Sequence, residues 1–206
     1  MKTFFTADLH FECPRLVENT RLGWTTVAEH DQLLVDNINE MVGRQDRLVI
    51  AGDFCGPKAS AEKWRQKISC RNIWFILGSH DKRGKMERAF GVNNVRDTML
   101  LKLGTQEDRK LVWCSHYPHC HWPHSHYGSY HAFGHVHGRK NQELDSIMPN
   151  RRSADVGVDS IRIVFGEARP VESGELLEFL SNRTGHGIID KKDRWKNRDY
   201  EKTVSE

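Results

Sequence analysis

Aspartate and histidine residues follow five of the predicted strands of this 206-residue chain, close to the point where each strand ends. The carboxyl edge of an α/β sheet is where ligands usually bind, so we expect these side chains to meet there. Residues two apart in extended backbone point the same way, which lets an Asp-x-His or His-x-His pair reach one ion. The residues are Asp8 and His10, Asp53, His80 and Asp81, His116, and His135 and His137.

The donor types indicate which metals this edge could bind. With His80 and Asp81 set aside, two carboxylates and four imidazoles remain, and this set suits Zn²⁺, Mn²⁺ or iron better than Ca²⁺ or an iron–sulfur cluster. The set exceeds the three side chains usual for a lone catalytic zinc. It suits two ions roughly 3.5–4 Å apart that share one carboxylate, as in phosphatases and nucleases. Gly52, Gly78 and Gly134 lie beside these donors and leave room for an ion and a phosphate.

The elements that must position these residues are short apolar strands and a few helices. Several runs are apolar throughout, as expected for strands covered on both faces. Strands are predicted at 2–7, 47–51, 72–77, 99–103, 110–114, 130–133 and 161–165. Helices are predicted at 26–42, capped by Thr25 or Thr26 and ended by Gly43, and at 60–68 and 82–90. This order indicates an α/β protein with one mixed sheet or two sheets.

Composition narrows the function classes. The length fits one globular domain, predicted at 1–189, followed by a strongly charged segment at 190–206. The formal net charge of +3 is too small to favour a nucleic-acid partner. No apolar run approaches the roughly 18 residues of a membrane span, and charged residues occupy the place of a signal peptide. Five cysteines without a CxxC pair argue against a disulfide framework, so we expect a cytoplasmic protein with no membrane partner.

The motifs, taken in order, resemble those of a known family. The chain reads Asp8-Leu9-His10, then Gly52-Asp53, then Gly78-Ser79-His80-Asp81, then His116, then Gly134-His135-Val136-His137. This order resembles the signature of calcineurin-like metallophosphoesterases. The stretch SHYPHCHWPHSHYGSYHAFGHVHG and the later ADVGVD resemble a subgroup of small microbial and phage phosphoesterases. The resemblance implies two packed mixed β-sheets flanked by helices, a four-layer α/β/β/α sandwich with the metals at its loops.

The resemblance also implies how the donors divide between two ions. One carboxylate would bridge them, and each ion would take further donors of its own. Asp8, His10 and His137 would hold the first ion, and His116 and His135 would hold the second, with Asp53 as the bridge. The metal would be manganese, zinc or iron, in a binuclear centre.

Three neighbouring residues have other expected roles. His80 would be a catalytic residue that faces the leaving group or the phosphate, and Asp81 would orient it. From the residues alone, Asp81 could equally cap the helix that follows it. Ser79 stands where the family carries Asn. Its shorter hydroxyl side chain is at most a weak ligand, so we expect the second ion to be held more weakly.

The expected function is metal-dependent hydrolysis of a small phosphomonoester or phosphodiester, with a nucleotide among the candidate substrates. Two ions would activate a water that attacks phosphorus, and His80 would protonate the leaving group. The alternative is a catalytically weakened, metal-binding member that serves as a binding module, because Ser79 replaces Asn. A nucleic-acid binder is disfavoured by the lack of a basic stripe.

Other polar and aromatic residues have simpler interpretations. His119, His121, His124, His126 and His131 are as well explained by a solvated loop, or by a core position for His131, as by phosphate contact, and His126 is the best candidate among them. Asp159 is expected to end a strand near the site without a catalytic role. Arg83 is expected at an exposed helix start, Trp122 in packing under a loop, and His30 and His186 at the surface. Cys55, Cys70 and Cys114 are expected as buried apolar residues.

Overall fold

A computed structural model of the chain describes residues 1–20, 26–181 and 183. Its strands form two sheets, one of five strands in the order β4-β3-β2-β1-β9 and one of four strands in the order β5-β6-β7-β8. The predicted charged segment at 190–206 lies outside the described residues. Among the described residues, no helix is both long and apolar enough to cross a membrane.

The five-stranded sheet brings three strand ends to one edge. Its strands β1, β2, β3 and β4 run parallel, and the short β9 pairs with β1 in the antiparallel direction. Because carboxyl ends of parallel strands share one edge, the segments after β1, β2 and β3 lie side by side. The strands are β1 (Thr3–Thr6), β2 (Arg47–Ile50), β3 (Asn72–Ile76), β4 (Val95–Arg96) and β9 (Val171–Glu172).

The four-stranded sheet contributes two further strand ends. Strands β6, β7 and β8 are parallel, whereas β5 is antiparallel to β6, so this sheet is mixed as well. His116 follows β6, and Gly134 follows β7. The strands are β5 (Thr98–Leu103), β6 (Lys110–Ser115), β7 (Tyr130–Phe133) and β8 (Ser153–Asp155).

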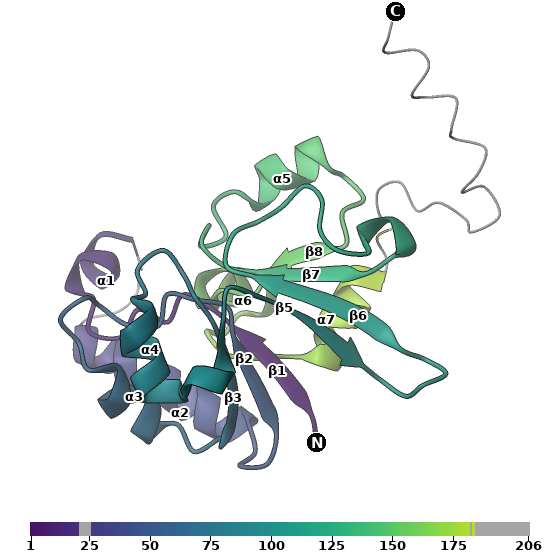
Figure 1. The fold of residues 1–206 in the computed structure, drawn as a ribbon. Coiled ribbons are helices and arrows are strands. Elements are labelled where there is room, and N and C mark those ends of the chain that lie inside the picture. Colours follow the sequence, from purple (N-terminus) through teal and green to yellow (C-terminus); the bar gives the residue numbers. More distant parts are fainter. Residues whose placement is uncertain (21–25, 182, 184–206) are drawn as a thin grey trace, which may run out of the picture.

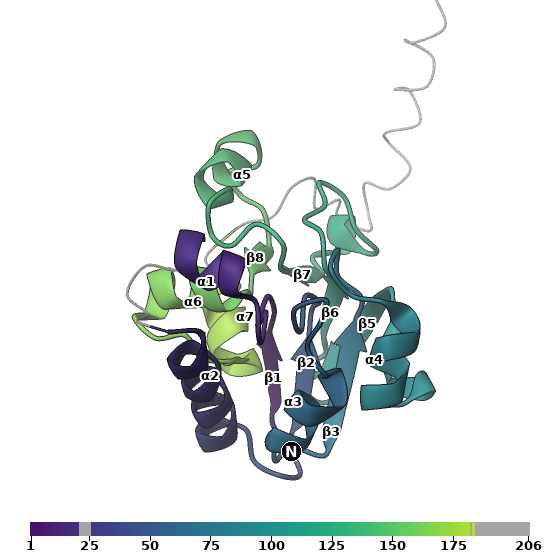
Figure 2. The same ribbon diagram turned by 90° about the vertical axis from the view of Figure 1, so that its left-hand side faces the viewer.

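Helices flank the two sheets. Figure 1 shows the first four helices on one side of the five-stranded sheet and the four-stranded sheet on the other. Figure 2 shows α6 and α7 beside β1, and α7 contacts both β1 and β8. The helices are α1 (Pro14–Thr20), α2 (Val27–Met41), α3 (Ala61–Lys67), α4 (Arg83–Phe90), α5 (Asn141–Ile147), α6 (Val158–Phe165) and α7 (Ser173–Ser181), with short 3₁₀ turns η1 (Val92–Asn94) and η2 (Ser125–Tyr127).

Alternating side chains of the strands fill two cores. On β1, Phe4 packs with the helix-side cluster and Phe5 with the cluster between the sheets, as the two-residue period of a strand requires. The helix-side cluster also contains Leu48, Ile50 and Phe75 together with Leu34 of α2 and Phe90 of α4. The cluster between the sheets combines Val49 and Ile76 with Val112, Cys114 and Ala132. The expected architecture of two packed mixed sheets flanked by helices is therefore confirmed.

Local signals account for the helix starts. Thr26 caps α2 in a reciprocal capping box with Glu29, and Ser60 accepts a hydrogen bond from the Lys63 N–H at the start of α3.

Cys55, Cys70 and Cys114 are buried as expected. Burial raises the pKa of the Cys55 thiol to about 11, so it stays protonated at neutral pH.

One predicted strand is a helix. Residues 161–165 belong to α6, in which Val158 and Ile161 face the core while Ile163 is 73% exposed. A five-residue apolar run does not distinguish a strand from a buried helix turn, because both place apolar side chains inside. The remaining predicted strands and the three predicted helices are present within one or two residues of their expected bounds.

Candidate metal centre

Two groups of three side chains lie at the edge where the strands of both sheets end. Within each group, one potential donor atom from every side chain lies within 4.8 Å of the others. The first group is Asp8, His10 and His137, and the second is Asp53, His116 and His135. These are the two sets of residues that the family resemblance implies for two ions.

Asp53 connects the two groups. Its Oδ2 atom lies 3.3 Å from Nε2 of His116 and 3.6 Å from Nε2 of His10, one histidine of each group. Its Oδ1 atom accepts a hydrogen bond of 2.8 Å from the backbone N–H of His80. Burial alone would raise the pKa of Asp53, but His116, the His80 N–H and His10 together hold it below its usual range. Asp53 is therefore an anion placed between two sets of imidazoles.

The His116 ring is held in one orientation by the backbone. Its Nδ1 atom donates to the Ala51 carbonyl over 2.8 Å, which leaves Nε2 facing Asp53. This Nε2 atom is buried and makes no hydrogen bond within the described part of the chain. In the neutral ring this nitrogen carries a lone pair that faces the Asp53 carboxylate, and a coordinated cation would satisfy it.

The other ligands are also tied to the framework. The backbone N–H of His135 donates to both carboxylate oxygens of Asp8, at 2.9 and 3.1 Å. Nδ1 of His137 lies 2.5 Å from Oδ2 of Asp159, so Nε2 is the nitrogen left for the first group. Burial lowers the pKa of His135, and neighbouring His116 adds to this effect. A neutral imidazole is the form that binds a metal ion.

The backbone carries strain at these positions. Five of the six candidate ligands have positive φ angles: Asp8 (57°), His10 (50°), Asp53 (55°), His135 (74°) and His137 (51°). This left-handed conformation costs roughly 1–3 kcal/mol for a residue with a side chain. Such strain is found at functional sites, where the surrounding fold holds side chains in the required directions.

Two glycines leave room for the carboxylates. A Cβ atom at Gly157 would lie 2.5 Å from Oδ2 of Asp8, and one at Gly78 would collide with Oδ1 of Asp53. Gly78 is one of the three glycines expected beside the donors, whereas Gly157, in the loop after β8, was not predicted. The site thus depends on close backbone approach from both sheets.

Asp81 does not have either of the roles expected for it. Its carboxylate accepts backbone N–H groups of Asp53 at 2.7 Å, of Gly78 at 2.8 Å and of Phe54 at 3.1 Å. The cap residue of α4 is Lys82, which makes no side-chain capping bond. The described contacts include no hydrogen bond from Asp81 to the His80 ring. Asp81 instead joins the loops after β2 and β3 through these three hydrogen bonds.

His80 and Ser79 lie at the exposed rim of the site. The His80 ring is edge-on to the His10 ring, with centroids 5.3 Å apart. The Ser79 hydroxyl donates to Oδ2 of Asp53 over 3.0 Å. Position 79 therefore reaches the Asp53 carboxylate, although its side chain is a hydroxyl.

Asp159 was placed wrongly by the sequence interpretation. It lies in the first turn of α6 rather than at a strand end, and its carboxylate contacts the predicted ligand His137. The pattern of α6 did not reveal this contact, because the position of a helix start relative to a distant loop is set by the tertiary fold.

The other described histidines do not belong to either group. His131 is fully buried, with Nε2 2.9 Å from the Ser115 hydroxyl and its ring against Trp113 and Trp122, so the core interpretation holds. His30, expected at the surface, is fully buried with Nδ1 2.8 Å from Asp31, because it lies on the inward face of α2. His119, His121, His124 and His126 are exposed, and His186 lies outside the described residues.

Arg83 and Trp122 have the simpler roles expected for them. Arg83 is exposed at the start of α4, where its guanidinium lies 2.7 Å from Asp97. Trp122 is buried, and its Nε1 atom donates to the Ser129 hydroxyl over 3.0 Å. Neither side chain is part of the candidate centre.

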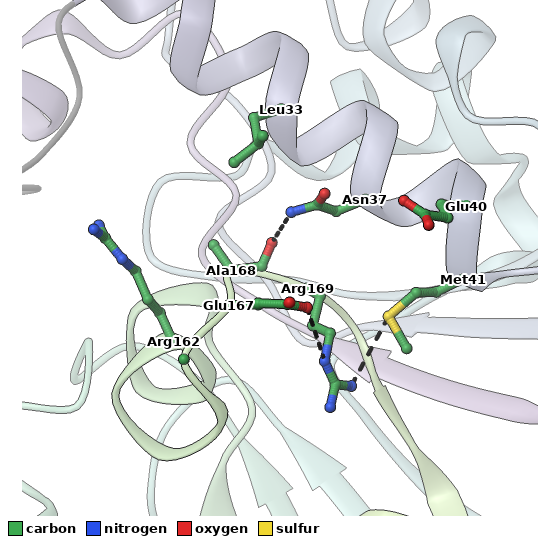
Figure 3. A pocket seen from close by; sticks show the side chains of 9 residues that line it. Leu33, Asn37, Glu40, Met41, Arg162, Glu167, Ala168 and Arg169 are labelled. Atoms are coloured by element: carbon green, nitrogen blue, oxygen red, sulfur yellow. Dashed lines mark hydrogen bonds and ion pairs between the residues drawn. The ribbon is translucent and has the colours of Figure 1, made fainter.

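Two cavities lie outside the ligand set. One of about 660 Å³ lies between α2 and the segment that links α6 to β9, where Asn37 donates to the Ala168 carbonyl over 2.9 Å (Figure 3). Another of about 420 Å³ borders Gly138 and Asp155 and is otherwise lined mainly by α5, α6 and α7. None of the six ligands lines either cavity.

Comparisons with known proteins support the fold. No model of a known protein family matches the chain. The chain is 25% identical over 162 residues to the uncharacterized protein MJ1445 of Methanocaldococcus jannaschii, a match that covers 78% of this chain and 83% of that protein. It also resembles the crystal structure of AQ665, a protein of unknown function from Aquifex aeolicus, with a TM-score of 0.62 at 16% identity, over 86% of this chain and 98% of that one. At this identity, the structural likeness shows that the fold is shared.

Proposed function

We propose that this protein is a metal-dependent phosphoester hydrolase with a centre of two divalent ions. The observation that carries the proposal is the position of Asp53. Its single Oδ2 atom lies within 3.6 Å of one histidine from each ligand group. A carboxylate in that position is what two neighbouring cations require, because its charge can be shared between them.

The residues present fit such a pair of ions. The donors are carboxylate and imidazole groups, which suit zinc, manganese or iron. The buried Nε2 atom of His116, with no hydrogen bond from the described residues, supports a cation on the side of the second group. Asp8, His10 and His137 would hold one ion, and Asp53, His116 and His135 the other.

The chemistry divides between the ions and the chain. Two bound divalent ions would neutralise phosphate oxygens and lower the pKa of a water that attacks phosphorus. As the bond from phosphorus to the leaving oxygen breaks, the exposed imidazole of His80 would donate a proton to that oxygen. Asp81 would keep the loops of Asp53 and His80 in place through its three backbone hydrogen bonds.

We also propose that the chain is a calcineurin-like metallophosphoesterase of the small microbial and phage subgroup. The order of the five motifs supports this, and so does the arrangement of their side chains at one edge of two mixed sheets. The small net charge favours a small phosphomonoester or phosphodiester, such as a nucleotide, over long nucleic acid.

Hydrolysis of generic esters tests the proposal. The protein would be stripped of metal, reloaded with Mn²⁺ or Zn²⁺, and assayed with p-nitrophenyl phosphate and bis(p-nitrophenyl) phosphate. We expect turnover of at least one ester that disappears with chelator and returns with metal. Two bound ions with no turnover of either ester at saturating metal would favour the binding-module alternative. A protein that binds no divalent ion would contradict the proposal.

A further inference from the structure

A carboxylate and a histidine face each other beside the first ligand group. Nδ1 of His137 lies 2.5 Å from Oδ2 of Asp159, with side chains that are only 16% and 21% exposed. A short contact shielded from water is stronger than a surface ion pair and keeps the ring in one orientation. The ring therefore presents Nε2 toward Asp8 and His10.

Among the described residues, no such carboxylate contacts Nδ1 of His116 in the second group. Nδ1 of His116 is held by the backbone carbonyl of Ala51 at 2.8 Å, which is a neutral acceptor. A carboxylate partner raises the electron density of an imidazole ligand and adds a negative charge near the ion, whereas a carbonyl does so less. The two ligand groups are therefore built differently, although each contains one carboxylate and two histidines.

The framework around Asp159 is fixed from two directions. Val158 and Ile161 of α6 are buried in the core, which anchors the helix turn that carries Asp159. Asp155 accepts the backbone N–H of Gly138 at 2.7 Å and that of Gly157 at 2.8 Å. These bonds join the loop after His137 to the loop before α6, so the distance between the two side chains is set by the fold.

We propose that Asp159 is a positioning residue that holds His137 for the ion of the first group and makes that ion the more tightly bound of the two. The inference rests on the proposed metal centre, and it adds to it a residue outside both ligand groups. It also predicts an order of loading, in which the first group fills before the group that contains His116 and His135.

A purely structural role for Asp159 must be separated from this one. An acidic residue in the first turn of a helix stabilises that helix through its dipole, and Asp159 is in that position. Loss of helix stability would lower the melting temperature of the metal-free protein and would affect both ions. Loss of the contact that orients His137 would instead lower the affinity for one ion only. That effect would be absent in a protein without His137.

The experiment measures metal affinity in backgrounds that each retain one site. In His135→Ala protein the first group is intact, and in His137→Ala protein the second group is intact. Asp159→Ala is added to each background, and binding of Zn²⁺ and Mn²⁺ is measured by calorimetry and elemental analysis. We expect a loss of roughly 10–100-fold in affinity in the His135→Ala background and a change of less than about threefold in the His137→Ala background.

Two further variants refine the result. Asp159→Asn retains an oxygen that can accept the Nδ1 hydrogen but removes the charge, so we expect an affinity between those of aspartate and alanine. Glu178→Gln is the control, because it removes one negative charge from an exposed position on α7. It should leave the metal affinities of both groups unchanged. The melting temperature of each metal-free variant is measured alongside.

The outcomes distinguish this inference from the proposed function. If the wild-type protein binds two ions and Asp159→Ala weakens neither, or weakens both equally, the positioning role is overturned while the metal centre stands. If affinity falls only together with the melting temperature of the metal-free protein, the role is structural. If the wild-type protein binds no divalent ion, both proposals fail.

Discussion

The hydroxyl of Ser79 donates a hydrogen bond to Oδ2 of Asp53 over 3.0 Å. That oxygen is the one that also faces His10 and His116. The serine hydroxyl can hydrogen-bond to the carboxylate, but its side chain is shorter than the asparagine that calcineurin-like phosphoesterases, which the motifs resemble, carry at this position. A substitution at position 79 should therefore change the affinity for the ion that we propose binds Asp53, His116 and His135.

Replacement of this serine gives the first prediction. Ser79→Asn should place an amide oxygen beside Asp53, lower the metal concentration for half-maximal activity by about tenfold and raise turnover. Ser79→Ala is the matched control, because it removes the hydrogen bond to Asp53 and adds no ligand. Metal titrations against one monoester and one diester measure the effect. Identical titrations for Ser79→Asn and the wild type would mean that the site has adapted to serine.

Loss of the shared carboxylate should be the most damaging single change among the ligands. Asp53→Asn keeps the shape of the side chain but removes the charge between His10 and His116, so both ions should bind less well. We expect activity to fall by at least about 10²-fold, together with bound metal. Asp97→Asn is the control, because Asp97 is an exposed carboxylate that pairs with Arg83. Full metal content with near-normal turnover in Asp53→Asn would remove Asp53 from the bridging role.

His80 should act in the reaction more than in metal retention. His80→Ala removes an exposed ring that belongs to neither ligand group, so metal content should stay at the wild-type level. The rate should fall by about 10²–10⁴-fold, as is usual for loss of a general acid. The fall should be smaller for an ester with a good leaving group, which needs no proton. Equal losses for good and poor leaving groups would indicate that His80 positions the phosphate instead.

The pH dependence of the metal-free protein follows from Asp53 and His116. Burial opposes the charge of each, yet Asp53 raises the pKa of His116 above 6.5 and His116 helps to hold the pKa of Asp53 below 3.8. The His116 contribution to stability is complete below pH 6.5 and is lost as pH rises through its raised pKa. The Asp53 contribution is complete above pH 3.8 and is lost as pH falls through its lowered pKa.

The measurement compares melting temperatures of chelator-treated protein with metal affinity over the same pH range. Stability from this pair should be greatest between pH 3.8 and 6.5 and should fall above that window. Metal affinity should rise with pH over the same interval, because an ion competes with the proton on His116. In His116→Gln protein the stability change above pH 6.5 should be absent. An unchanged profile in that variant would assign the effect to another group.

The sequence predicted the strand ends better than the contacts around them. Apolar runs followed closely by Asp or His located β1, β2, β3, β6 and β7, because buried parallel strands give a continuous apolar pattern. The six candidate ligands were predicted from the Asp and His residues at these strand ends, and the structure gathers them into two groups. The run at 161–165 was misassigned, since five apolar residues fit an inward helix turn as well as a strand.

The supporting residues of the site could not be predicted locally. Asp81 binds backbone groups of Asp53 and Phe54 in the loop after β2 as well as Gly78 in its own loop. Asp159, at the start of α6, contacts His137 in the loop after β7. Which neighbour a short carboxylate meets depends on how the loops approach each other after the sheets pack. His30 was misplaced for a similar reason, because the inward face of α2 includes a polar pair with Asp31.

The two ligand groups each draw on both sheets. Asp8 and His10 follow β1 of the five-stranded sheet, whereas His137 follows β7 of the four-stranded sheet. In the second group, Asp53 comes from the first sheet and His116 from the second. An ion bound by either group would therefore act as a cross-link between the two layers, as a disulfide does in an extracellular protein. Separation of the sheets would require release of both ions, so resistance to unfolding should increase with the concentration of free metal.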